Sequence, residues 1–276
     1  MRRRGTLDQP ITFSGVGIHS GQNCTLTISP AEVYTGIVFR RRMNSADYDI
    51  PASVYFSRHQ NRATRLESND AKVMTPEHLL AALFGTGITD AIIGLDSDEV
   101  PILDGSSAQY CDSIIAAGHT PFDVVYSQTV VKTPQIVSRG DSSVLALPCD
   151  DLAFSMILTY DNFIGTQSVT WTFDTTSFTT EIAPARTYAF QSEIDQLLAA
   201  GLGKGGSLEN AIVIGDTEFI TPLRFPDELA RHKLLDLIGD LSLVGTDLKG
   251  HFVGIRSGHS LNREMALKLA RLGTNT

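Results

Sequence analysis

Three ionisable side chains recur at four-residue intervals in one apolar segment of the sequence. They are His232, Asp236 and Asp240, in R-H-K-L-L-D-L-I-G-D. Residues i and i+4 lie on the same face of an α-helix, so an imidazole and two carboxylates would converge there. The stability of an apolar helix does not call for such a cluster, whereas a metal site or an acid–base relay does. The alternative is a hydrogen-bonded polar pair on a partly exposed face, because H-x-x-x-D alone is a common spacing.

A second ionisable pair, Glu77-His78, begins another predicted helix. A helix N-terminus disfavours the imidazolium and keeps the ring neutral, as a metal ligand must be. Glu77 could alternatively do no more than complement the helix dipole. His78 together with His232 and Asp236 gives two imidazoles and one carboxylate, a set that suits catalytic Zn²⁺ with an open fourth position. Fe²⁺ binds the same donor types, so the sequence leaves the metal open.

Two further polar residues stand at the ends of predicted elements. His259, in R-S-G-H-S-L-N, lies between a strand and a helix, where it is either a helix-start histidine or a general acid and oxyanion stabiliser. Thr187, in A-P-A-R-T-Y, offers a hydroxyl and a backbone N–H just ahead of a helix. It is either an N-cap or a donor to a developing oxyanion. Asp240 could orient a neighbouring histidine.

The composition of the chain argues against several classes of protein. The chain has 276 residues and a formal net charge of -9, which argues against a nucleic-acid binder. Its three cysteines include no C-x-x-C, so we expect neither a thiolate metal site nor a disulfide framework. No signal-peptide pattern follows the basic N-terminus, and no apolar run approaches the roughly 18 residues of a membrane span. We expect a cytoplasmic protein with at most transient membrane contact.

Each half of the sequence shows strands, a helix, a strand and a second helix. In the first half the predicted strands are Thr25–Ile28, Ile37–Phe39, Ile50–Phe56 and Ala91–Leu95, and the helices follow Thr75 up to Gly85 and span Ser106–Ala117. In the second half the strands are Ser143–Leu147, Phe154–Leu158, Val169–Phe173, Ala211–Ile214 and Gly250–Ile255, and the helices are Tyr188–Ala200, Asp227–Val244 and Leu261–Leu272. We infer two α+β domains of similar plan, residues 1–122 and 123–276, divided near Pro121.

Six motifs in order make the chain resemble a known family. They are G-V-G-I-H-S-G, T-P-E-H-L-L-A-A-L, E-V-P-I-L-D-G-S, A-P-A-R-T-Y, F-P-D-E-L-A-R-H-K-L-L-D-L-I-G-D-L and S-G-H-S-L-N. Together they resemble the UDP-3-O-acyl-N-acetylglucosamine deacetylase family (LpxC), zinc amidases of lipid A biosynthesis, from about Gly5 to Leu272. The family fold has two α+β domains, each a small, mostly antiparallel sheet with two helices, and the helices pack between the two sheets.

The resemblance also implies a role for each site residue. The zinc ligands would be His78, His232 and Asp236, with a water in the fourth position. Glu77 matches the general base, and His259 matches the histidine that assists as acid and electrostatic stabiliser. Asp240 matches the residue that orients that histidine, and Thr187 matches the threonine beside the oxyanion.

The resemblance also implies how the substrate is held. Lys233 matches a lysine that contacts the anionic part of an acylated UDP-sugar. Tyr188 stands where the family usually has Phe beside the sugar, and Phe190 falls in the region of the second domain that lines the acyl passage. We expect a monomer.

Three other functions remain to be weighed against this one. A zinc hydrolase acting on a different acyl amide would keep the same metal site. A sugar-nucleotide or lipid-binding module would be expected to have lost at least one of the catalytic or ligand residues, and all are present: Glu77, His78, His232, Asp236 and His259. A nucleic-acid binder built from small α+β domains fits poorly with the acidic balance.

Overall fold

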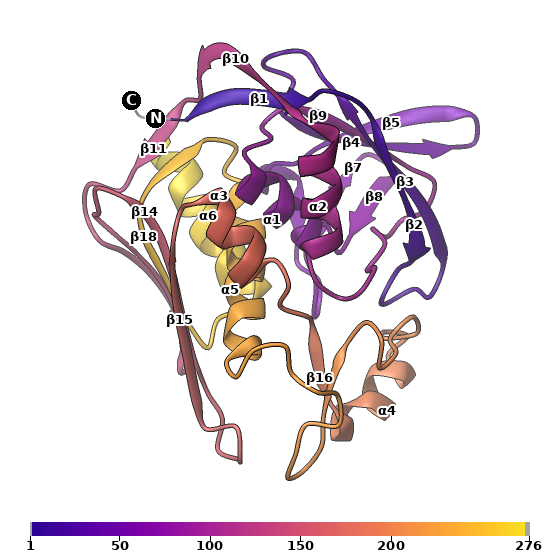
Figure 1. The fold of residues 1–276 in the computed structure, drawn as a ribbon, viewed down its shortest axis with the longest axis vertical. Helices are drawn as coiled ribbons and strands as arrows, with labels where there is room; N and C mark the ends of the chain where they lie inside the picture. The colour runs from indigo at the N-terminus through magenta and orange to yellow at the C-terminus, as the bar shows by residue number, and fades with distance from the viewer. Residues whose placement is uncertain (1, 274–276) are drawn as a thin grey trace.

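The structure, a computed structural model, describes residues 2–273 and contains two main sheets with helices between them (Figure 1). The first sheet has the order β2 (Ile11–Val16), β3 (Asn23–Pro30), β9 (Ala91–Leu95), β4 (Ile37–Met43) and β5 (Ala46–Pro51). Within this order β9 and β4 are parallel, and the other neighbours are antiparallel.

The second sheet repeats the plan of the first. Its order is β12 (Gln135–Arg139), β13 (Ser142–Leu147), β18 (Asp247–Ile255), β14 (Leu152–Thr159) and β15 (Thr166–Thr172), and β11 (Gln128–Val130) also pairs with β18. Here β18 and β14 are parallel, at the positions that β9 and β4 hold in the first sheet. The expected duplication of an α+β plan is therefore confirmed at the level of topology.

Each sheet has one helix before and one after its central strand. The helices are α1 (Glu77–Thr86) and α2 (Ala108–Ala117) around β9, and α5 (Glu228–Ser242) and α6 (His259–Gly273) around β18. Every residue of α1 is buried, because this apolar helix packs on α5 while α5 packs on α6, β14 and β15. Figure 1 shows the helices between the two sheets, as the family resemblance implies. No helix within residues 2–273 is long and apolar enough to span a membrane.

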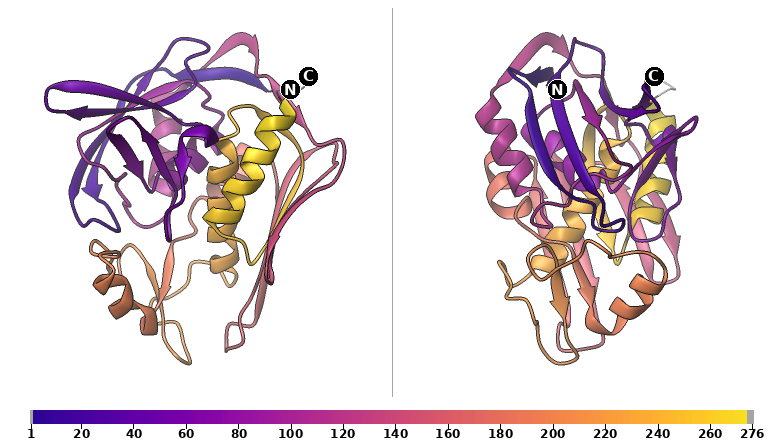
Figure 2. Two further views of the ribbon diagram at one scale, coloured as in Figure 1. Left: turned by 180° about the vertical axis from the view of Figure 1, so that it is seen from behind. Right: turned by 90° about the vertical axis from the view of Figure 1, so that its right-hand side faces the viewer.

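An insertion occupies the same place in each half, between the fifth strand of the sheet order and the first helix. The first contains a 3-10 turn (Val54–Phe56), β6 (Ser57–Arg58), β7 (Arg65–Ser68) and β8 (Ala71–Met74). The second contains α3 (Thr175–Ser177), a π turn (Phe178–Ile182), β16 (Tyr188–Phe190), α4 (Gln191–Ala199) and β17 (Ile212–Ile214). Figure 2 shows the part that carries α4 as a lobe below the central helices.

The N-terminal strand joins the two halves. β1 (Arg3–Leu7) pairs with β10 (His119–Val125), a strand that contains Pro121. The guanidinium of Arg2 lies 4.5 Å from the ring centre of Phe84 and donates to Asp247 Oδ1 at 2.7 Å. The division at residues 122/123 stays a prediction, because β10 itself crosses it.

Several predicted element boundaries are wrong, among them those of one strand and two helices. The helix expected from Tyr188 begins only at Gln191, because residues 188–190 form β16 and pair in parallel with β17. The strand expected to reach Phe56 ends at Pro51. The first helix runs past Gly85, where a Cβ would lie 2.2 Å from the Phe178 ring, and its left-handed cap is Gly87. Gly85 thus permits close packing and does not end the helix.

Candidate metal centre

A glycine in α5 lets two helices approach closely at the candidate site. A Cβ at Gly239 would lie 2.2 Å from the carbonyl oxygen of Glu77, so only glycine permits this spacing. The first turn of α1 consequently lies against the middle of α5. This contact brings His78 beside His232 and Asp236, from segments more than 150 residues apart in the sequence.

The three predicted metal ligands converge on one point. His78 Nε2 lies 3.6 Å, and His232 Nε2 3.5 Å, from Asp236 Oδ1. A tetrahedral ion with bonds of roughly 2.0–2.1 Å would hold its ligand atoms about 3.3 Å apart, so both distances to Asp236 are close to the spacing it needs. Asp236 Oδ1 is buried and has no hydrogen-bond partner among residues 2–273. His232 Nδ1 lies 3.2 Å from the Ala185 carbonyl oxygen, a contact that leaves Nε2 free to bind a metal.

The charge states of these groups suit a cation. Burial lowers the pKa of His78 to about 3 and also lowers the pKa of His232, so both rings are neutral at pH 7. Burial acts to raise the pKa of Asp236, but the attraction of Lys233 and the nearby histidines outweighs it and holds that pKa well below its usual range. Lys233 Nζ donates to Asp236 Oδ2 at 2.9 Å. Two neutral imidazoles and one carboxylate thus face the same point.

Glu77 and His259 lie beside the three ligands. His259 Nε2 is 3.6 Å from Glu77 Oε1 and 3.8 Å from Asp236 Oδ2. Burial raises the pKa of Glu77 to about 8. Burial acts to lower the pKa of His259, but the charges of Asp240 and Glu77 outweigh it and raise that pKa to about 9. A protonated imidazole and a carboxyl group with a raised pKa therefore share one buried site, as acid–base chemistry requires.

Asp240 fixes the orientation of His259 and is itself held by neighbours. Its Oδ2 accepts from His259 Nδ1 and from Asn262 Nδ2, each at 2.9 Å, and Oδ1 accepts from the Thr64 hydroxyl. The Thr64 N–H faces both oxygens of Glu77 at 3.3 Å. Sequence reasoning missed Asn262 and Thr64. The spacing of Asn262, three residues after His259 on α6, could have indicated it, whereas Thr64 lies in an insertion with no comparable signal.

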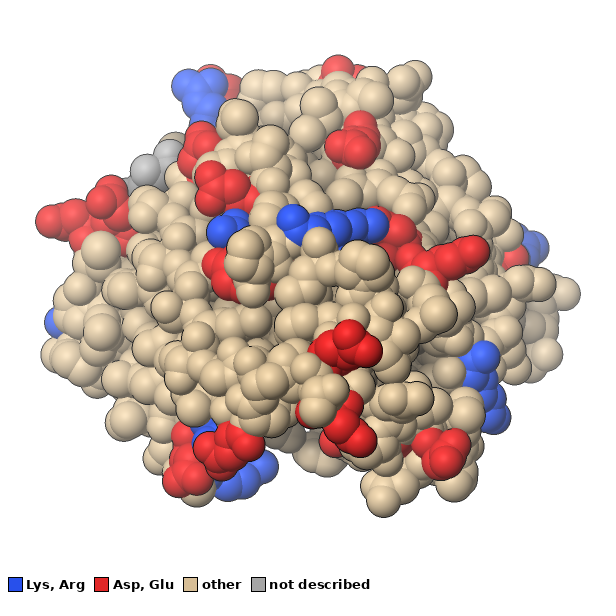
Figure 3. All heavy atoms as spheres, turned by 60° about the horizontal axis from the view of Figure 1, so that its bottom comes forward, with Lys and Arg blue, Asp and Glu red and all other residues tan. Residues whose placement is uncertain are grey.

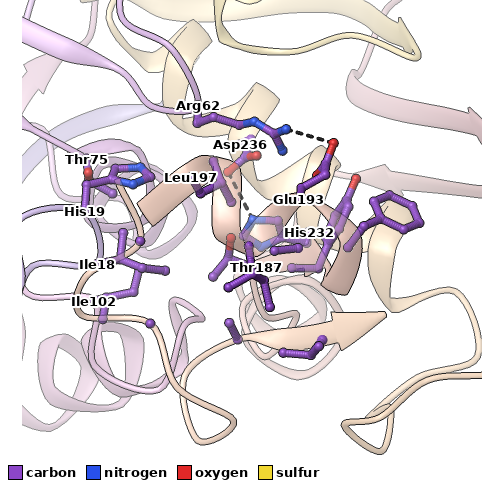
Figure 4. A pocket seen from close by; sticks show the side chains of 18 of the residues that line it. Ile18, His19, Arg62, Thr75, Ile102, Thr187, Glu193, Leu197, His232 and Asp236 are labelled. Carbon is purple, nitrogen blue, oxygen red and sulfur yellow. Dashed lines mark ion pairs between the residues drawn. The ribbon is translucent and has the colours of Figure 1, made fainter. Parts of the chain in front are cut away.

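A cavity of about 550 Å³ lies at this site (Figure 4). Its polar part contains the three ligands, Glu77, His259 and Lys233. Apolar side chains from both halves form much of the remaining wall: Ile18, Ile102, Phe190, Ile194, Leu197 and Val213. His19 also lines the cavity. The cavity therefore offers an apolar chain a path beside an ionisable site.

Thr187, Tyr188 and Phe190 all line this cavity. The Thr187 N–H donates to the Gly105 carbonyl oxygen at 2.8 Å, so only the hydroxyl is available, and the expected backbone donor is wrong. The Tyr188 hydroxyl lies 2.7 Å from the Tyr160 hydroxyl, and Lys233 Nζ is 5.6 Å from the Tyr188 ring centre. Tyr188 thus adds a polar group to this wall.

The face of the molecule that carries the second insertion has no broad basic patch. Figure 3 shows acidic side chains scattered over it, with basic side chains few and mostly beside acidic ones. A polyanion needs a continuous basic surface. This face gives no support to the binding of a nucleic acid.

Comparisons with known proteins agree with this geometry. The model of the family described as LpxC: UDP-3-O-acyl N-acetylglycosamine deacetylase matches residues 4–271. The protein named UDP-3-O-acyl-N-acetylglucosamine deacetylase from Chlamydia felis (strain Fe/C-56) is 42% identical over 272 residues, 97% of each chain. Proteins of the same name from Geobacter sp. (strain M21) and Pseudomonas entomophila (strain L48) are each 41% identical, over 96% and 98% of this chain and 88% and 90% of their own. The chain therefore belongs to the UDP-3-O-acyl-N-acetylglucosamine deacetylase family.

Proposed function

We propose that this protein removes the N-acetyl group of UDP-3-O-acyl-N-acetylglucosamine, releasing acetate, in lipid A biosynthesis. The observation that carries the proposal is the convergence of three metal-ligating side chains beside Glu77 and His259 in one partly apolar cavity. Membership of a family of metal-dependent amidases supports it. Related proteins at about 41% identity carry this activity in their names.

The metal that we propose is Zn²⁺, held by His78, His232 and Asp236. Two neutral imidazoles and a carboxylate with an open fourth position are typical of catalytic zinc sites, and Fe²⁺ is the alternative. When bound, such an ion acts as a Lewis acid that polarises the acetamide carbonyl and lowers the pKa of a water toward about 7. Lys233, which bonds the second oxygen of Asp236, would keep that carboxylate oriented and charged.

Glu77 and His259 would carry out the acid–base steps. Glu77 would take a proton from water as the water oxygen attacks the acetamide carbonyl carbon. The positive charge of a bound cation lowers the raised pKa of Glu77 toward the range in which a base works near neutral pH. Protonated His259, oriented by Asp240, and the hydroxyl of Thr187 would stabilise the negative charge that develops on the carbonyl oxygen. The C–N bond breaks once Glu77 or His259 has protonated the nitrogen, which yields acetate and the free amine.

The remaining cavity residues would bind the substrate. We assign the anionic part to Lys233, the sugar to Tyr188, and the acyl chain to the apolar wall around Phe190, in the proposed second domain, residues 123–276. Neither a nucleic-acid partner nor a transmembrane segment is part of the proposal. We further propose a cytoplasmic monomer that has at most transient contact with the membrane.

Release of acetate from a panel of substrates tests the proposal. The panel contains UDP-3-O-acyl-N-acetylglucosamine, UDP-N-acetylglucosamine and simple N-acetyl sugars, each assayed with metal-loaded protein. We expect by far the highest kcat/KM on the acylated nucleotide sugar. Equal or greater acetate release from a simple N-acetyl sugar would favour a zinc hydrolase with another substrate. No release from any of them would refute the enzyme assignment.

A further inference from the structure

An ion pair joins the two insertions at the edge of the catalytic cavity. Arg62, in the first insertion, places a guanidinium nitrogen 3.0 Å from Glu193 Oε1, on α4 of the second insertion. Both side chains line the cavity, and Figure 4 shows Arg62 pointing toward Glu193 along one edge of it. The two insertions occupy corresponding places in the duplicated plan, and the pair links one to the other.

Helix α4 forms a wall of the cavity although its own packing is light. None of its residues is buried. Ile194, Leu197 and Leu198 line the cavity, and Leu198 is 47% exposed. Few buried apolar contacts are typical of elements that open at low free energy. The position of this wall therefore depends on the contacts that tie α4 to the rest of the molecule.

The ion pair of Arg62 with Glu193 is one of these contacts. Its backbone adopts a left-handed conformation, φ 66°, which is uncommon for a residue with a side chain. Glu193 Oε2 is buried and has no hydrogen-bond partner within the described residues, while Oε1 pairs with Arg62, so Arg62 supplies the charge that compensates this carboxylate. The alternative is that Glu193 only complements the N-terminal dipole of α4, where it lies in the first turn. That alternative gives Arg62 no role.

We propose that the Arg62–Glu193 pair is a latch that holds α4 closed over the apolar part of the cavity and thereby sets the affinity for the substrate's acyl chain. Neither side chain is among those assigned to the reaction, so the two act as a positioning pair. With the latch broken, α4 moves away from the first insertion and its apolar side chains pack less well on a bound chain. The identity of the chain as an acyl group rests on the proposed function, whereas the latch itself does not.

Steady-state kinetics with reversed charges test the latch. Each partner of the pair is about two-fifths exposed, so breaking it should raise KM for the acylated substrate by about two- to fivefold. We expect this in Arg62→Ala and Glu193→Ala, with kcat and metal content unchanged. Arg62→Glu and Glu193→Arg should be worse, because each places like charges together. The double reversal, Arg62→Glu with Glu193→Arg, should restore KM.

Two comparisons separate an effect on acyl-chain binding from a general effect of changing helix α4. Turnover of UDP-N-acetylglucosamine, which lacks the chain, should show the same KM in all variants. Asp195→Ala, an exposed change on the same helix, is the matched control and should leave KM unchanged. If the single changes alter KM equally for both substrates, or if the double reversal shows only the sum of the single effects, the latch is refuted.

Hydrogen exchange gives a readout that does not need activity. Amides of residues 191–199 should exchange faster in Glu193→Arg and Arg62→Glu than in the wild type, and return to the wild-type rate in the double reversal. Unchanged exchange in both single reversals would overturn the latch even if the enzyme deacetylates as proposed. Absence of deacetylation by the wild type, with exchange behaving as described, would refute the function and leave the latch standing.

Discussion

At the helix contact that brings the candidate metal ligands together, Gly239→Ala has two opposite physical effects. Alanine in a helix interior is favoured over glycine by about 1 kcal/mol, so helix propensity alone predicts a more stable protein. The structure predicts the reverse, because the added Cβ would lie 2.2 Å from the Glu77 carbonyl oxygen and 2.9 Å from its carbonyl carbon. Both atoms belong to the backbone of α1 and cannot rotate away.

The size of the clash determines the expected result. Nonbonded carbon contacts have their optimum near about 3.5–4.0 Å, so the two helices must separate by roughly 1 Å. Overpacking of this kind costs about 1–3 kcal/mol, which exceeds the gain in propensity. We expect the free energy of unfolding to fall by up to about 2 kcal/mol. Displacement of Glu77 and His78 by about 1 Å should lower kcat/KM by roughly 10²-fold.

Urea unfolding measures the expected loss of stability, and acetate release measures the expected loss of activity. Gly94→Ala is the matched control, because a Cβ there meets no atom of the described residues nearer than 4.0 Å, at the Thr27 carbonyl oxygen. We expect Gly94→Ala to retain wild-type activity. A Gly239→Ala protein that is as stable as the wild type and turns over at the wild-type rate would refute the close helix contact on which this description of the site depends.

Three further predictions concern the charged groups. Glu77→Gln should keep its metal by elemental analysis and lose about 10²–10⁴-fold in kcat, so normal turnover would exclude Glu77 as the base. In metal-free protein the folded-state pKa values of Glu77 and His259 are raised to about 8 and about 9, so both groups bind protons more tightly in the folded state. The urea midpoint should therefore fall as pH rises from about 6.5 to 9, and a rising midpoint would contradict this. Arg2→Ala leaves the buried Asp247 carboxylate without its guanidinium and should lower the unfolding free energy by about 2–4 kcal/mol. Arg3→Ala breaks an exposed pair and should change the unfolding free energy by less than about 0.5 kcal/mol. Equal losses in the two variants would show that burial of the pair does not matter.

The core of the fold could be predicted because its elements carry local signals. The apolar run after Glu77 and the four-residue spacing in α5 indicate helices, and Ala91–Leu95 has the composition of a buried strand. The second insertion could not be predicted in the same way. Tyr188 to Phe190 is continuous with a helical pattern, and only pairing with β17, more than 20 residues further along the chain, makes it a strand. A non-local partner outweighed local propensity there.

The candidate site could likewise be predicted only where local sequence determines its geometry. His232 and Asp236 share a helix face, so their proximity follows from the sequence alone. That His78 joins them depends on the packing of α1 on α5, which spacing does not indicate and which the family resemblance supplied. Thr64 and Arg62 enter from loops of the first insertion through contacts with distant residues. Nothing in their local sequence marks them.

The central claim is that His78, His232 and Asp236 hold one divalent cation, and metal content tests it most directly. Elemental analysis of anaerobically purified protein should find one ion per chain in the wild type and in Glu77→Gln. Single alanine substitutions of the three ligands should each lose most of it while retaining a cooperative unfolding transition. Full metal content in folded His78→Ala and Asp236→Ala proteins would contradict the claim.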